Sequence, residues 1–85
     1  MGDPTYANLT TEEGILTGEI AFNWDIKVGR LTIMNDSGTV DLRWKLHENE
    51  DYATLYPTET ISLAVRTRTL WLSSTNGQYR VWGLG

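Results

Sequence analysis

Few residues of this 85-residue sequence could do chemistry. It contains no cysteine and a single histidine, His47. Without thiols or a second imidazole, the chain has neither the ligands of a thiolate or histidine-rich metal site nor a cysteine nucleophile. His47 is followed by Glu48 and could act as a general base only beside a nucleophile, and no motif marks one. We therefore predict no catalytic residue, no metal or cofactor site and no enzymatic activity.

Two binding chemistries are also disfavoured. The acidic loop of Glu48, Glu50 and Asp51 lacks the alternating Asp/Asn ligands and terminal Glu of known calcium loops, so we interpret it as a solvated loop. The arginines and aromatic residues of the last third could stack on single-stranded bases, as in small β-barrels. A net charge of −4 opposes binding to a phosphate backbone, so we predict no nucleic-acid partner.

The tryptophans point to a binding surface instead. Trp24 and Trp44 fall in phase with the predicted core, whereas Trp71 and Trp82 face outward if their leucine and valine neighbours face inward. Exposed tryptophan beside arginine is typical of interface hot spots. A subunit interface, a sugar-stacking platform and coverage within the fold all remain open. The candidate interface residues are Tyr6, Leu9, Arg66, Arg68, Trp71, Tyr79, Arg80 and Trp82.

Charge is distributed unevenly along the chain. Residues 1–25 contain five acidic residues and no basic one, and residues 61–85 contain three arginines and no acidic residue. The two segments should attract each other, either within one subunit or between neighbours.

Apolar and polar residues alternate after residue 14, which indicates half-buried strands. In residues 15–24 we expect one face of the strand to be buried: Leu16, Gly18, Ile20, Phe22 and Trp24. Residues 28–34, with Leu31 and Ile33 on one face, and residues 39–47 are predicted to pair as a hairpin around the turn of residues 35–38.

Further strands are expected at 52–56 and 60–65. Residues 70–72 and 79–84 should form a closing hairpin around Asn76-Gly77, because Asn-Gly favours tight hairpin turns. Six to seven short strands predict an all-β fold, a small antiparallel β-sandwich or partly open barrel.

We divide the sequence into an N-terminal arm, residues 1–14, and a β-sandwich domain, residues 15–85. A domain this small buries little surface, and without cysteines or a metal a partner chain is the remaining support. No apolar run is long enough to cross a membrane, and the N-terminus lacks the features of a signal peptide, so no membrane partner is expected.

The last third carries a resemblance. Residues 55–63 (LYPTETISL), 66–72 (RTRTLWL) and 79–83 (YRVWG) resemble an arrangement in small β-sandwich virion proteins of tailed bacteriophages. The resemblance implies a capsid decoration (cement) protein, a homotrimer on the capsid exterior that contacts the major capsid protein after assembly in the host bacterial cytoplasm. Such proteins use terminal arms to clasp neighbours, a description that the predicted arm of residues 1–14 fits. The alternatives are a carbohydrate- or receptor-binding module of a tail or fibre, and a monomeric β-sandwich without a ligand.

Overall fold

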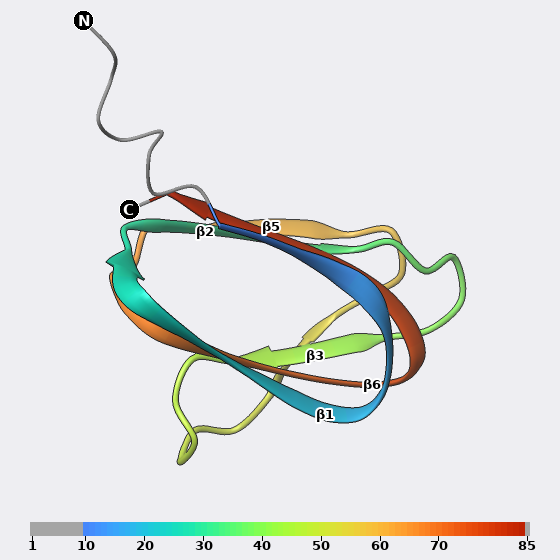
Figure 1. Ribbon diagram of the computed structural model, residues 1–85. Helices are drawn as coiled ribbons and strands as arrows, with labels where there is room; N and C mark the ends of the chain where they lie inside the picture. The colour runs from blue at the N-terminus through green and yellow to red at the C-terminus, as the bar shows by residue number, and fades with distance from the viewer. Residues whose placement is uncertain (1–9, 85) are drawn as a thin grey trace, which may run out of the picture.

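The chain folds as a single curled sheet. The computed structural model describes residues 10–84 and contains six strands and no helix in that range (Figure 1). The all-β prediction is confirmed, and the antiparallel sheet curls into a half-barrel. The strands are β1 (Thr10–Val28), β2 (Arg30–Asn35), β3 (Leu42–Lys45), β4 (Ala53–Leu55), β5 (Thr60–Leu63) and β6 (Thr67–Leu84). No helix that could cross a membrane occurs in the described part of the chain.

Strand β6 lies at the centre of the sheet. Along one edge it pairs with β1, and along the other its first half pairs with β3 and its second half with β2. Strand β4 extends the sheet beyond β3, and β5 extends it beyond β2. Because β1 and β6 both bend, β2 and β5 lie in one layer and β3 lies in a facing layer (Figure 1).

A bulge in β6 coincides with the bend. Leu16 pairs with Gly77 and Thr17 pairs with Thr75, which leaves Asn76 without a partner residue on β1. Asn76 has a φ of 60°, and its side-chain oxygen accepts a hydrogen bond of 2.7 Å from the Thr17 hydroxyl. The predicted hairpin at Asn76-Gly77 is therefore wrong. The left-handed backbone that asparagine tolerates bends one continuous strand here instead of joining two.

The predicted hairpin of residues 28–47 is also wrong, because β2 and β3 do not pair with each other. The fully buried Asn35 explains the difference. Its amide donates hydrogen bonds to the carbonyls of Val40 (2.8 Å) and Leu55 (3.0 Å), and its oxygen accepts one from the Ser37 amide (3.0 Å). These bonds fix residues 36–41 as a crossing between the layers, and β3 begins only at Leu42.

The predicted strand alternation is confirmed except at Gly18. Leu16, Leu31 and Ile33 are buried, and the partly buried Ile20, Phe22 and Trp24 pack against the same core. Gly18, predicted on the buried face, is exposed and has a φ of 98°, a left-handed conformation that interrupts the regular pleat. Each fully buried leucine or isoleucine contributes about 1.5–3 kcal/mol of transfer free energy.

Aromatic rings fill part of the space between the layers. Phe22 stacks on Trp24 at a centroid distance of 6.1 Å, and Tyr79 tilts against Phe22 at 6.0 Å. The space enclosed by the strands is therefore a packed core.

The boundaries of several predicted elements shift. The strands predicted at 52–56 and 60–65 are present as the shorter β4 and β5. Residues 10–14, assigned to the arm, pair with residues 79–83 as the start of β1, and the rest of the arm lies outside the described residues.

Candidate functional site

A pocket of about 440 Å³ lies where β3 ends and β4 begins, and we call it the β3–β4 pocket. The loop of residues 46–52 that joins the two strands forms part of it, and in Figure 1 this loop hangs below β3. Six residues line the pocket: Trp44, Lys45, Leu46, Glu50, Asp51 and Ala53.

The register of β3 and β4 leaves the pocket open. Trp44 pairs with Ala53 across the ladder, so the largest side chain of β3 faces one of the smallest residues. Strand β4 has only three residues and no further strand of the described chain beyond it. The indole of Trp44 is therefore only half-buried, although it packs against the core.

Glu50 organises the loop. Its Oε1 accepts hydrogen bonds from the backbone amides of Leu46 (3.2 Å) and His47 (3.1 Å), and its own amide donates to the His47 carbonyl (3.1 Å). Hydrogen bonds to a carboxylate are stronger than those between neutral groups. They hold one wall of the pocket in place and leave Oε2 without a described partner.

Lys45 is held by three groups. Its Nζ donates a hydrogen bond of 2.9 Å to the Glu48 carbonyl and lies 4.5 Å from the ring centroid of Tyr52 and 5.3 Å from that of Trp71. Both ring distances are within the range of cation–π attraction.

Tyr52 ties the same loop to β1. Its hydroxyl donates a hydrogen bond to the Glu19 carboxylate. Burial, reinforced by the Glu19 bond and charge, raises the pKa of Tyr52 to about 12. Tyr52 thereby fixes the loop to β1. Lys45 of β3 connects the loop to β6, because its ammonium group binds the Glu48 carbonyl and lies over the ring of Trp71.

The structure separates the predicted interface residues. Leu70, Leu72 and Val81 are fully buried, which places Trp71 and Trp82 on the outer face, where each is half-buried. Arg66, Arg68 and Arg80 are exposed. Tyr79 is only 7% exposed and belongs to the core; burial, followed by the charge of Glu12, raises its pKa. Tyr6 and Leu9 lie outside the described residues.

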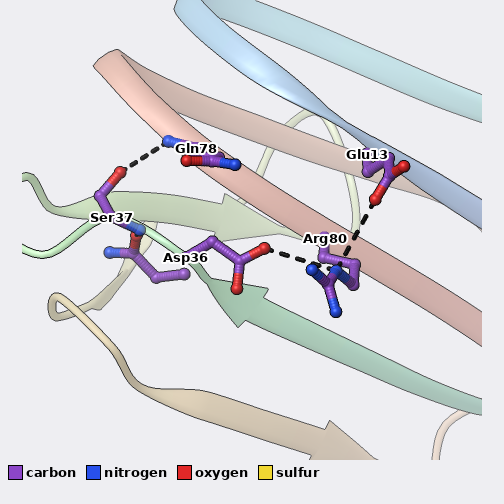
Figure 2. Close-up of polar contacts among 6 residues, drawn as sticks. Glu13, Asp36, Ser37, Gln78 and Arg80 are labelled. Carbon is purple, nitrogen blue, oxygen red and sulfur yellow. Dashed lines mark hydrogen bonds and ion pairs between the residues drawn. The ribbon is translucent and has the colours of Figure 1, made fainter.

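Arg80 shows where the opposite charges meet. Its Nε lies 3.4 Å from a carboxylate oxygen of Asp36 and 3.7 Å from one of Glu13 (Figure 2). One arginine of the basic segment therefore pairs with one glutamate of the acidic segment within the same chain, whereas Asp36 belongs to neither segment. The exposed pair with Glu13 contributes at most about 1 kcal/mol.

Sequence reasoning missed the β3–β4 pocket. It assigned Trp44 to the core and Glu50 and Asp51 to a solvated loop. The alternation correctly turned Trp44 inward, but alternation alone does not reveal that its neighbour strand is too short to cover it. Among the described residues, no three histidine, aspartate or glutamate side chains are grouped to hold a metal ion.

The sequence matches no protein-family model and no curated protein. Solved structures share the fold. Protein NMB1881 from Neisseria meningitidis is 12% identical with a TM-score of 0.63, over 92% of this chain and 76% of that one. VPA0057 from Vibrio parahaemolyticus, of unknown function, is 16% identical with a TM-score of 0.59, over 86% and 72%. The Cupin_2 domain of an XRE family transcriptional regulator from Enterobacter cloacae is 15% identical with a TM-score of 0.56, over 89% and 94%.

The fold is therefore cupin-like, a double-stranded β-helix. Chains described as FeII HppE and as a DMSP lyase also share it, with TM-scores of 0.57 and 0.56 at 8% and 14% identity. This chain spans 42% and 38% of their lengths. The fold thus occurs in enzymes and in proteins of unknown function, and by itself does not decide whether this chain catalyses a reaction.

Proposed function

We propose that this chain is a non-enzymatic binding domain whose ligand occupies the β3–β4 pocket. One observation carries the proposal: a preformed recess of about 440 Å³ combines the half-buried Trp44 with the carboxylates of Glu50 and Asp51. Ligand sites are typically recesses of this size in which apolar walls supply affinity and a few polar groups supply orientation. The hydrogen bonds of Glu50 and Lys45 hold the walls before a ligand arrives, which lowers the entropic cost of binding.

The packing of the interior supports binding at this rim. Leu31, Ile33 and Val81 have no exposed surface, and Phe22 and Tyr79 fill further space between the layers. A ligand inside the half-barrel would have to displace these side chains, whereas the β3–β4 pocket needs no such rearrangement.

A small-molecule screen followed by amide NMR spectra tests the proposal. Bound compounds should shift the signals of residues 44–53. The variant Ala53→Phe should abolish binding, because the new ring would stand beside Trp44 in the pocket. Thr54→Phe is the matched control, since residue 54 is exposed on the opposite face of β4 and should leave binding intact.

Two results would overturn the proposal. Compounds that shift signals elsewhere in the sheet, or that bind equally to both variants, would place the site outside the β3–β4 pocket. Chemical conversion of a bound compound during incubation with the wild-type protein, but not with Ala53→Phe, would make the domain an enzyme.

The role in a phage particle is a second proposal. It draws on the resemblance and on the outward-facing, half-buried Trp71 and Trp82, which could pack against another copy of the chain or a major capsid protein. Light scattering should then give the mass of a trimer, and the protein should co-sediment with capsids. A monomer that leaves capsids unbound would contradict it. Neutral saccharides in the ligand screen test the carbohydrate alternative.

A further inference from the structure

The carboxylates of the β3–β4 pocket have no cation of their own. Glu50 and Asp51 are both exposed, and among the described side chains neither forms an ion pair. Glu50 uses Oε1 for two backbone amides, so its second oxygen is available. The pocket therefore offers negative charge that the described fold does not neutralise.

Lys45 is the basic side chain that lines the same pocket, yet its ammonium group is engaged elsewhere. The Glu48 carbonyl accepts its hydrogen bond, and the rings of Tyr52 and Trp71 lie 4.5 and 5.3 Å away. These three contacts compete with an ion pair to Glu50 or Asp51. The carboxylates thus remain open to a charge brought by a ligand.

Trp44 adds an aromatic wall to this charge. The face of an indole ring attracts cations through its quadrupole more strongly than the rings of tyrosine or phenylalanine do, and it also packs against apolar groups. An anion would be repelled by the two carboxylates, and a neutral ligand would gain nothing from their charge.

From this combination we infer that the ligand of the β3–β4 pocket is a small organic cation, with an ammonium group between Trp44 and the carboxylates and an apolar part on Leu46 and Ala53. The inference rests on the proposed function and names its ligand class.

Choline and 3,3-dimethylbutan-1-ol form the decisive pair of probes, because they share shape and hydroxyl group and differ in the positive charge. Calorimetry and amide NMR should give choline about tenfold higher affinity, from a cation–π contact plus an exposed ion pair. Choline binding should weaken as salt rises, since salt screens charges at an open site. N-acetyl-lysine methylamide, tested in parallel, shows whether the primary ammonium group of a lysine side chain binds in the pocket as the quaternary ammonium group of choline does.

Two variants locate the charge. Asp51→Asn preserves side-chain shape and should weaken choline binding about threefold to fivefold. Asp41→Asn removes the same charge from an exposed residue outside the pocket and should change binding by less than about 1.5-fold at physiological salt. Trp44→Leu, checked for folding by its NMR spectrum, should lose at least as much affinity as Asp51→Asn because it removes the aromatic face.

The outcomes separate this inference from the proposed function. Equal binding of both probes in the pocket, or equal effects of the two aspartate variants, would refute the cationic ligand while leaving the pocket as a binding site. Binding of neutral or anionic compounds alone would do the same. Failure of every compound to shift residues 44–53 would refute the pocket itself.

Discussion

Replacing Gly77 by alanine tests the bend that brings the two layers together. A Cβ built on Gly77 would lie 2.7 Å from the Cβ of Ser74 and closer still to its Oγ, below any distance that real Cβ atoms show. Gly77 is outside the left-handed backbone region, so the penalty of the substitution is steric. Ser74 cannot move freely, because its hydroxyl donates a hydrogen bond of 2.7 Å to the Asp41 carbonyl.

The expected loss of stability follows from these contacts. Overpacking at a buried site costs about 1–3 kcal/mol, and losing the Ser74 hydrogen bond costs about 1 kcal/mol. Alanine also restricts the unfolded chain more than glycine does, which raises the free energy of unfolding by about 0.5 kcal/mol. We expect Gly77→Ala to lower the free energy of unfolding by about 1.5–3.5 kcal/mol, a large share of the roughly 4–13 kcal/mol typical of a domain this size.

Urea denaturation followed by tryptophan fluorescence measures this change. Gly38→Ala is the control, because Gly38 is exposed and its Cβ would meet nothing within 4 Å, so we expect a change within about 0.5 kcal/mol. Ser74→Gly removes both clashing atoms together with the hydrogen bond to Asp41, so Gly77→Ala should cost less than about 0.5 kcal/mol when it is added to Ser74→Gly. Equal stability of the two alanine variants, or an equal loss from Gly77→Ala with and without Ser74→Gly, would refute the close approach and with it the register of the bulge.

Two further predictions concern polar groups that hold the connections. Asn35→Ala should lower the free energy of unfolding by about 3 kcal/mol, because it removes three hydrogen bonds and leaves the carbonyls of Val40 and Leu55 without that donor. The midpoint of thermal unfolding, measured by circular dichroism, should fall by about 12–24 °C. A fall of less than about 4 °C would contradict the buried network. The pKa of Tyr52 is raised from 10 to about 12, so its contribution to folding stability is complete below pH 10 and is lost as pH rises from about 10 through 12. The free energy of unfolding should therefore fall over that range, and it should fall less steeply in Tyr52→Phe. Identical pH profiles of the two proteins would contradict the raised pKa.

The faces of the strands could be predicted from the sequence because burial of one face imposes a period of two. Leu31 and Ile33 follow this rule, and both have no exposed surface. The same rule correctly placed Phe22 and Trp24 on the face of their strand that points toward the core, although the neighbouring strand was not known. Periodicity thus specifies orientation relative to the core.

Strand pairing could not be predicted in the same way. Asn76-Gly77 and the turn at residues 35–38 both signal a reversal, yet one is a bulge within β6 and the other a crossing between layers. The local signal reports which backbone angles a residue tolerates. Which strand lies next depends on distant contacts such as those of Asn35 with Val40 and Leu55, and no short window of sequence contains them.

The location of the pocket follows from the same topology. Strand β6 is long enough to pair with β3 and then with β2, one after the other along the same edge, but β4 covers β3 over three residues only. Trp44 and Ala53 form the last residue pair between β3 and β4, so the sheet ends beside the Trp44 side chain and leaves it partly uncovered. The packed interior and the incomplete edge together favour the rim, and not the inside of the half-barrel, as the place for the proposed ligand. If that reasoning is right, Ala53→Phe should eliminate the pocket at little cost in stability, because residue 53 is exposed and the added ring would cover apolar surface of Trp44.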